Sequence, residues 1–203
     1  MKEVWTKNYE YMKTMGLESV SGTGSSIECT KEILLELPLV FYRNDIRSIL
    51  DIPCGDFNWM QHLDFRYLDY TGVDVVEELI AANKKKYPNT NFQCLDITSD
   101  ALPAVDLVIS RDCFVHLSYA DMWDALENVE QSGAKYLLTT TFQRTTPNQD
   151  IPSGGWRTLN LELAPLFFPP PLELINEHCP EGGGIYTDKC LGLWSLASLR
   201  EIL

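Results

Sequence analysis

Short apolar runs typical of β-strands alternate along the chain with segments of helical periodicity. Between the fourth and fifth runs, Met122, Ala125, Leu126 and Val129 keep helical spacing behind a serine cap at Ser118. Such alternation is the pattern of a mostly parallel sheet covered by helices on both faces, so we predict one α/β domain. The runs predicted as strands are 47–51, 70–74, 91–95, 105–110, 136–141, 173–177 and 191–197.

Two more helices are predicted from their caps and from the prolines that follow them. Ser25 and Glu28 form a capping box for the first helix, and Pro38 is expected to end it. Asp74 is expected to cap the second helix, which ends just before Pro88. Together with the helix predicted after Ser118, these two helices can cover both faces of the sheet.

Composition narrows the class of protein. The chain has 203 residues, of which 45% are hydrophobic and 22% charged, as expected for one globular domain. It has no run of about 18 apolar residues and no signal-peptide core near its start. We therefore expect no membrane span and a cytoplasmic location, either alone or as part of a larger multi-domain chain.

The formal charge of −13 argues against a nucleic-acid partner, because an acidic protein repels phosphate backbones. The basic run Lys84–Lys86 lies at the end of a predicted helix, where it complements the helix dipole. None of the six cysteines forms a C-x-x-C pair, and there are only three histidines. We therefore expect free thiols and no metal centre.

Candidate binding chemistry lies at the carboxyl ends of the first three predicted strands. Asp51 can accept a hydrogen bond from a ligand ammonium, and the turn at Gly55 would let the backbone approach a ligand. Asp74 comes 23 residues after Asp51, a spacing typical of a carboxylate that binds both ribose hydroxyls. Asp96 can accept from an adenine amino group, with Ile97 over the ring. Each aspartate alone could be a helix cap or a surface carboxylate, but strand ends that converge on one crevice favour a nucleoside site.

The turn itself argues against a dinucleotide. A pyrophosphate would need the pattern G-x-G-x-x-G, whereas the stretch from Cys54 to Trp59 holds one glycine. Asp56 stands where a phosphate would come, and its charge would repel a dianion. A cofactor with a sulfonium and an ammonium is compatible with this charge, so we favour S-adenosylmethionine (SAM) over a nicotinamide cofactor.

The segment Asp51-Ile-Pro-Cys-Gly-Asp56 resembles the D-x-x-C/G-G-x-G motif of class I SAM-dependent methyltransferases. Asp51, Asp74 and Asp96 also follow that family's order of cofactor-binding residues, and the resemblance covers nearly the whole chain. It implies a Rossmann-like α/β fold with a seven-stranded, mostly parallel sheet whose last strand is antiparallel. Asp56 departs from the second glycine of many members.

This resemblance implies a division of the chain and a set of cofactor ligands. Residues 1–45 would form an N-terminal helical or lid region and residues 46–203 the core. Backbone N–H groups of the segment 21–25 precede a helix and are suited to the carboxylate of SAM, although a flexible loop is the alternative. The residues that we assign to SAM, or to its product S-adenosylhomocysteine, are Gly24, Ser25, Asp51, Pro53, Cys54, Gly55, Asp56, Trp59, Asp74, Val75, Asp96, Ile97 and Arg111.

Four segments narrow the resemblance: Ser-Gly-Thr-Gly-Ser-Ser, Asp-Ile-Pro-Cys-Gly-Asp-Phe-Asn-Trp, Arg-Asp-Cys-Phe-Val-His-Leu and Gly-Gly-Trp-Arg-Thr-Leu-Asn-Leu. They are similar to a bacterial and large-virus branch that includes the methyltransferase domain of a multi-domain chlorovirus protein that builds capsid glycans. This similarity implies a sugar hydroxyl as acceptor, with rhamnose as one candidate.

Candidate catalytic residues follow the fourth predicted strand. A sugar hydroxyl is a poor nucleophile and benefits from a base. His116 is the first candidate, with Asp112 as base, orienting group or metal ligand; alternatively, His116 caps the next helix and Asp112 braces the loop. The long segment 147–171 is rich in proline, glycine and aromatic residues, which is typical of a functional loop.

Within that loop, Trp156 could stack on a sugar ring while Arg157 and Asn160 reach its hydroxyls; a loop anchored by one buried tryptophan is equally compatible. Near the start of the chain, Trp5, Tyr9 and Tyr11 belong to a lid or to plain packing. Our hypothesis is a SAM-dependent O-methyltransferase that acts on a sugar or glycan. The alternatives are a methyltransferase for another small molecule, with or without a divalent metal, a nicotinamide-dependent oxidoreductase, and a non-catalytic SAM-binding domain.

Overall fold

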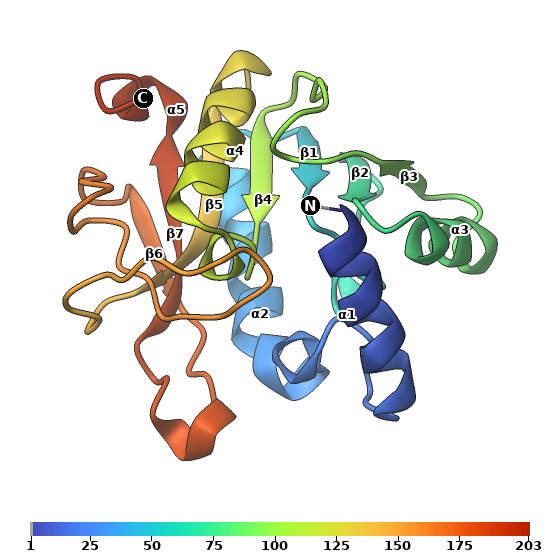
Figure 1. Cartoon of the computed structure of the whole chain (residues 1–203). Helices are drawn as coiled ribbons and strands as arrows, with labels where there is room; N and C mark the ends of the chain where they lie inside the picture. The colour runs from blue at the N-terminus through green and yellow to red at the C-terminus, as the bar shows by residue number, and fades with distance from the viewer. Residues whose placement is uncertain (1) are drawn as a thin grey trace.

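A computed structural model describes residues 2–203 and shows a single twisted sheet of seven strands (Figure 1). The strand order is β3-β2-β1-β4-β5-β7-β6. Strands β1 to β5 pair in parallel, whereas β7 is antiparallel to both of its neighbours, β5 and β6. The predicted Rossmann-like sheet with an antiparallel last strand is confirmed. The strands are β1 (Ser48–Asp51), β2 (Asp69–Asp74), β3 (Asn91–Cys94), β4 (Leu107–Ser110), β5 (Tyr136–Phe142), β6 (Glu173–Asn176) and β7 (Lys189–Ser195).

Alternate residues of each central strand belong to two separate hydrophobic cores, one on each face of the sheet. In β4, Leu107 and Ile109 join the core beneath α2 (Ile27–Arg43), whereas Val108 joins the core beneath α4 (Tyr119–Gln131). The strand is buried at every position, as expected for a parallel strand covered on both sides. Helix α3 (Glu77–Lys86) packs beside β2 and β3.

Helix α2 differs from its prediction at both ends. Its N-cap is Ser26, which accepts a hydrogen bond from the Cys29 N–H at 3.4 Å, rather than Ser25. The helix also continues through Pro38 to Arg43. A proline inside a helix costs about 3 kcal/mol, but Val40 and Phe41 beyond it are buried against the sheet, and each contributes about 1.5–3 kcal/mol. Burial therefore outweighs the lost hydrogen bond.

The other two predicted caps have opposite outcomes. The cap of α4 is confirmed, because the hydroxyl of Ser118 accepts from the Asp121 N–H at 3.1 Å. The cap of α3 is wrong: Val76 occupies the N-cap, and the Asp74 carboxylate accepts from the N–H groups of Val76 at 3.0 Å and Gly55 at 3.2 Å. Asp74 thus ties the ends of two segments together at the carboxyl edge of the sheet.

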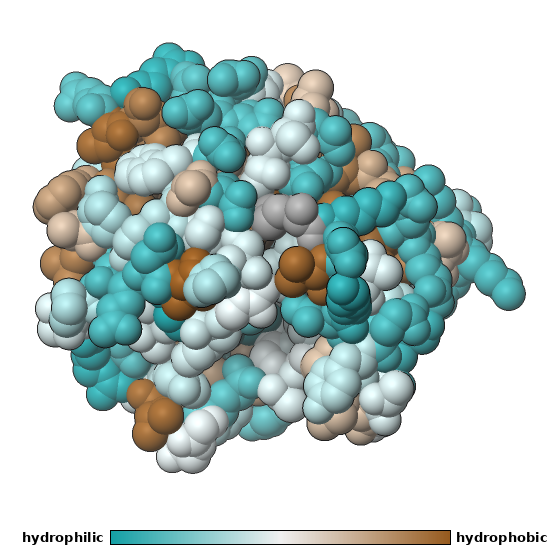
Figure 2. Space-filling model, viewed as in Figure 1, coloured by the Kyte–Doolittle hydropathy of each residue, from teal (hydrophilic) through white to brown (hydrophobic). Residues whose placement is uncertain are grey.

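Helix α1 (Lys2–Thr14) lies across this edge and buries none of its residues (Figure 1). Lys2 pairs with Glu77 at 2.5 Å and Lys13 with Glu78 at 2.6 Å, so both ends of α1 are attached to the first turn of α3. Hydrophilic side chains cover most of the face seen in Figure 2, which is the same view. No helix within residues 2–203 is both long and apolar enough to span a bilayer.

Candidate active site

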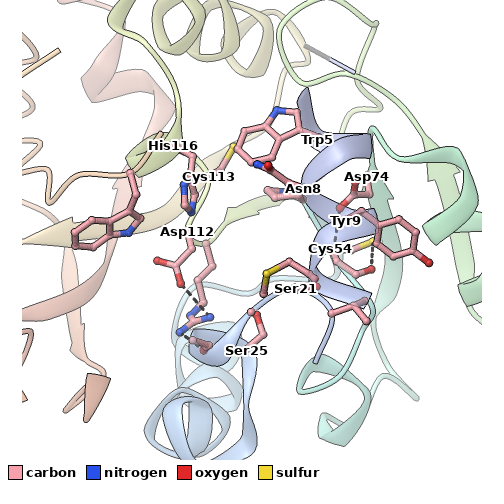
Figure 3. Close-up of a pocket in the computed structure, with 18 of the residues that line it drawn as sticks. Trp5, Asn8, Tyr9, Ser21, Ser25, Cys54, Asp74, Asp112, Cys113 and His116 are labelled. Carbon is pink, nitrogen blue, oxygen red and sulfur yellow. Dashed lines mark hydrogen bonds and ion pairs between the residues drawn. The ribbon is translucent and has the colours of Figure 1, made fainter. Parts of the chain in front are cut away.

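A cavity of about 640 Å³ opens at the carboxyl ends of the strands, beneath α1 (Figure 3). Every residue assigned to the cofactor except Asp56 lines it: Gly24, Ser25, Asp51, Pro53, Cys54, Gly55, Trp59, Asp74, Val75, Asp96, Ile97 and Arg111. His116, Asp112 and Trp156 line the same cavity, as do Trp5, Tyr9 and Tyr11 from α1. The structure does not bring Arg157 or Asn160 to its wall.

Three aspartates from three strand ends face this one cavity. Asp51 and Asp74 are almost completely buried, and burial raises the pKa of Asp51 to about 7 and that of Asp74 to about 6. Asp51 accepts a hydrogen bond from the Tyr70 hydroxyl at 2.7 Å. The third, Asp96, accepts from the N–H of Thr98 at 3.0 Å. Neither Asp51 nor Asp74 forms an ion pair within residues 2–203, so their burial is costly, and a cationic ligand would offset that cost.

The turn at Gly55 lines the cavity and also packs against the segment that precedes α2. Its φ is 53°, and a Cβ there would lie 2.1 Å from the Oγ of Ser21. Ser21 belongs to the segment that precedes α2, and its hydroxyl accepts from the Asp56 N–H at 3.0 Å. A glycine is therefore required because the N-terminal segment packs directly on the turn.

Asp56 explains how that segment is held. Its carboxylate accepts hydrogen bonds from the Ser19 hydroxyl at 2.8 Å, the Val20 N–H at 2.9 Å and the Ser21 hydroxyl at 3.2 Å. Nearby, the Asn58 amide donates to the Ser25 carbonyl at 3.0 Å. Asp56, which departs from the motif described above, thus holds the segment 19–25 in the cavity wall and does not itself line the cavity.

A network of buried charges forms the wall after β4. The Arg111 guanidinium donates to Glu177 at 2.7 Å and to the Gly24 carbonyl at 2.9 Å. Lys189 pairs with Asp112 at 2.6 Å and lies 3.4 Å from Glu177. Burial alone would raise the pKa of Asp112, but Lys189 and Arg111 outweigh it and hold that pKa well below its usual range. Asp112 is consequently a weak base.

His116 lies in the 3₁₀-helix η3 (Phe114–His116), half-buried at the cavity wall. Its Nδ1 lies 2.6 Å from the Gly155 carbonyl, which can only accept, so Nδ1 carries the proton and Nε2 the lone pair. Burial lowers the pKa of His116. The ring of Trp5 meets the imidazole edge-to-face at 5.7 Å. The arrangement presents a neutral imidazole whose free nitrogen can accept a proton.

Aromatic side chains gather at the same end of the cavity. The Trp156 ring lies 5.2 Å from that of Tyr186 and 6.2 Å from that of Phe142, and 46% of Trp156 remains exposed. Arg157, in contrast, braces the loop: its N–H donates to the Val115 carbonyl at 3.0 Å and its Nη1 to the Leu117 carbonyl at 2.7 Å. Asn160 also donates within the loop, to the Gln143 carbonyl at 3.4 Å.

Sequence reasoning missed several residues of the cavity. Lys189 and Tyr186 come from the last sixth of the chain, and Asn8 and Met12 come from α1. A buried lysine at the start of a strand, as Lys189 is, carries no local motif. Only the α1 pattern, with aromatic residues at Trp5 and Tyr9, gave a signal that this region faces the site.

The donor set of the cavity fits a compact cationic nucleoside. Five carboxylates, from Asp51, Asp74, Asp96, Asp112 and Glu181, line it against two cations, Arg111 and Lys189. A pyrophosphate would meet excess negative charge, whereas a sulfonium and an ammonium would be stabilised. The volume lies within the range of small-molecule sites. Among residues 2–203, no group of three or more His, Cys, Asp or Glu side chains is arranged to hold a metal ion.

Residues 49–132 match the profile of a protein family described as a methyltransferase domain. This range starts in β1 and ends just after α4, so it includes the strand ends that carry Asp51, Asp74 and Asp96. No curated protein sequence matches the chain significantly.

Several solved structures are similar to this fold at low sequence identity. The PH0226 protein of Pyrococcus horikoshii OT3 has a TM-score of 0.62 and 16% identity, over 92% of this chain and 98% of that one. The methyltransferase domain of bacterial CtHen1-C has a TM-score of 0.50 and 15% identity, over 56% of this chain and 66% of that one. A SAM-dependent methyltransferase of Clostridium acetobutylicum ATCC 824 has a TM-score of 0.49 and 17% identity, over 55% and 50%.

The chain therefore spans between half and two thirds of the length of the last two proteins. The structural similarity establishes the fold, and the family match covers the half of the sheet that carries the three aspartates. Residues 49–132, which are similar to a methyltransferase domain, are also the part of the chain whose strand ends line the acidic cavity.

Proposed function

We propose that this chain transfers a methyl group from SAM to a hydroxyl of a sugar or glycan, with His116 as the general base. The observation that carries the proposal is the state of His116. Its Nδ1 is fixed by the Gly155 carbonyl, its pKa is lowered by burial, and its Nε2 is left to accept a proton inside the cavity. An amine acceptor, which is already nucleophilic when neutral, has less need of such a group.

The residues of the cavity divide between cofactor and acceptor. Asp51 would accept from the ammonium of SAM, Asp74 from the ribose hydroxyls and Asp96 from the adenine amino group. Arg111 and the backbone of Gly24 lie together, where they suit the carboxylate of the methionine end. Their positions support this division, because they follow the edge of the sheet in the order of the strands.

The acceptor would lie between Trp156 and His116. The exposed face of Trp156 offers a surface on which the C–H face of a sugar ring can pack. Tyr186 and Phe142 hold the indole ring of Trp156 in place. When bound, SAM supplies a methyl group on a sulfonium, which departs as the neutral thioether of S-adenosylhomocysteine. The acceptor oxygen forms the new O–CH₃ bond, and its proton passes to Nε2 of His116.

Asp112 has a different role in this scheme. Because Lys189 and Arg111 hold its carboxylate ionised, it cannot take the proton at neutral pH. Its fixed negative charge beside the cavity would instead stabilise the imidazolium that forms on His116 during transfer. We assign Asp112 to this orienting and electrostatic role.

The test is a panel of acceptors with release of S-adenosylhomocysteine as the readout. Neutral glycosides, amines and thiols are offered to the wild-type chain and to His116→Gln, which keeps a hydrogen-bonding side chain but cannot act as a base. We expect release with glycosides, and a loss of about 10²–10⁴-fold in kcat for the variant with unchanged SAM affinity. Release with amines alone, or a variant as active as the wild type, would contradict the proposal.

A further inference from the structure

A second cavity of about 460 Å³ lies beside the acceptor end of the first. Tyr186 lines both cavities, so its side chain stands between them. The second cavity is formed by three segments: residues 144–149 after β5, residues 157–158 of the long loop, and residues 185–188 before β7. No step of the proposed methyl transfer uses it.

The charges of the two cavities are opposite. The cofactor cavity is lined by five carboxylates and two cations, whereas the second is lined by Arg144, Arg157 and a single carboxylate, Asp188. That carboxylate is already engaged, because it accepts from the Arg144 side chain at 3.0 Å and the Arg144 N–H at 2.8 Å. In a protein of net charge −13, this cavity is a local excess of positive charge.

Both arginines retain unused donors. The hydrogen bonds of the Arg144 side chain all come from Nη2, to Asp188, Thr187 and the Ile185 carbonyl, and 63% of the side chain is exposed. Arg157 is 93% buried by accessible surface, yet its Nε and Nη2 have no hydrogen-bond partner within residues 2–203. Its Nη1 donates to the Leu117 carbonyl and its guanidinium lies over the Tyr119 ring at 5.2 Å, so Arg157 adds positive charge to the cavity wall while Arg144 carries the exposed donors.

The remaining walls are rich in hydroxyl and amide groups. Thr145, Thr146, Thr158 and Gln149 line the cavity and supply hydrogen-bond donors without adding negative charge. Guanidinium groups with neighbouring hydroxyls are the usual donors to phosphate and carboxylate oxygens. Combined with the shared wall at Tyr186, they suit an anionic group attached to whatever occupies the acceptor end of the first cavity.

We propose that the second cavity binds the anionic group of a sugar acceptor, a phosphate or a carboxylate, while the sugar ring lies across Tyr186 beside Trp156 and His116. The preferred substrate is thus an anionic sugar, such as a sugar phosphate or a uronic acid, which would be methylated more efficiently than a neutral glycoside. This inference rests on the proposed sugar O-methylation for its acceptor, but the anion site itself stands on the second cavity alone.

The test compares three acceptors with the same ring: a neutral methyl glycoside, the sugar 1-phosphate and the uronic acid. We expect kcat/KM for the preferred anionic acceptor to exceed that for the glycoside by at least about 10-fold, mainly through KM; whether phosphate or carboxylate is preferred identifies the source. Arg144→Gln should reduce this preference about 10-fold, and Arg144→Lys should restore part of it. Asp188→Asn, which breaks the same ion pair but keeps the cation, should preserve the preference.

Equal use of all three acceptors would overturn the inference, as would an equal loss of preference in Arg144→Gln and Asp188→Asn, since a structural role of the ion pair would explain both. The anion site can also be tested without methyl transfer, by measuring the binding of inorganic pyrophosphate by calorimetry. This measurement distinguishes a failure of the anion site from a failure of the proposed function. If no sugar is methylated, the proposed function fails, and pyrophosphate binding about 10-fold weaker in Arg144→Gln than in the wild type still supports the site. Equal binding by the two proteins would remove it.

Discussion

The carboxylate of Asp56 accepts a hydrogen bond from the backbone N–H of Val20 at 2.9 Å and thereby joins the glycine turn after β1 to the segment that precedes α2. Two serine hydroxyls, of Ser19 and Ser21, donate to the same carboxylate. Asp56 is thus a positioning residue for the cofactor cavity, because the segment that it holds continues into Gly24 and Ser25.

Replacing Asp56 by alanine should weaken SAM binding about 10-fold, since three hydrogen bonds to the segment 19–21 are lost together. Asp56→Asn keeps an acceptor oxygen and should lose less. The dissociation constant from calorimetry is the measurement. Asp64→Ala is the matched control, because Asp64 is an exposed carboxylate whose side chain pairs with Arg66; an equal effect of both variants would contradict the role of Asp56.

The pH dependence of methyl transfer should report His116. Burial lowers its pKa below 6.5, and only the neutral imidazole can accept the proton. At saturating SAM, kcat/KM for the acceptor should therefore be constant above pH 6.5 and fall about tenfold per unit at pH values below the pKa of His116. Saturation with SAM keeps the titration of Asp51 out of this profile. A profile without this decrease would exclude His116 as the base.

Asp51 should stabilise the complex and destabilise the empty protein. Its folded pKa of about 7 lies above the usual aspartate value of 3.8, so the folded state holds the Asp51 proton more tightly than the unfolded state does. Stability is unaffected below about pH 4, falls between pH 4 and 7 by about 1.4 kcal/mol per unit, and stays reduced above pH 7. Asp51→Asn should therefore raise the Tm of the ligand-free protein at pH 8 while it abolishes measurable SAM binding.

The control for this prediction is Asp69→Asn, an exposed aspartate at the other end of the neighbouring strand. It should change neither Tm nor SAM affinity appreciably. A Tm of Asp51→Asn below that of the wild type at pH 8 would show that the carboxylate is not an electrostatic burden in the empty cavity.

Helix α1 should control how fast the cofactor leaves. It covers the cavity, and the ion pairs Lys2–Glu77 and Lys13–Glu78 attach it to α3. Both ion pairs are exposed and therefore individually weak, so we expect the double variant Lys2→Gln/Lys13→Gln to increase the dissociation rate of S-adenosylhomocysteine only by about 3–10-fold. Stopped-flow fluorescence of Trp5 and Trp59, which both line the cavity, is a suitable readout.

Lys7→Gln provides a matched control on the same helix. Lys7 pairs with Glu3 within α1 and makes no connection to α3, so its loss should leave the rate unchanged. The wild-type rate should also rise with salt concentration, because salt screens exposed charges. A rate that responds equally to Lys7→Gln would indicate a general loss of helix stability instead.

The sequence predicted the fold, and the residues that it placed at the strand ends line one cavity, for a physical reason. Strand periodicity, the spacing of Asp51 and Asp74 and the glycine turn are all local signals, and the convergence of parallel strand ends places them together without further information. The same logic brought Asp96 to the cavity. The ends of helices were predicted less well from local signals. Helix α2 continues past Pro38 because burial of Val40 and Phe41 outweighs the helix-breaking tendency of the proline.

The acceptor side was harder to predict because it depends on contacts between distant segments. Arg157 was expected to reach a sugar, but its side chain turns toward the Leu117 carbonyl and braces the loop. Lys189 gave no signal, since its role arises only when β7 brings it to Asp112, 77 positions earlier in the chain. Gly55 was predicted to let a ligand approach the backbone, and it does line the cavity, but no local signal indicated that Ser21 also packs against it.

The bonds of Arg111 have a consequence for how the protein is made. Its guanidinium joins Gly24, from the start of the chain, to Glu177, from near the end, and both segments contribute to the wall of one cavity. During translation, the strands β1 to β4 can pair early, but the wall stays open until residue 177 and the lysine of β7 have left the ribosome. The wall of this cavity would therefore close in a nascent chain only after β7 has emerged and joined the sheet.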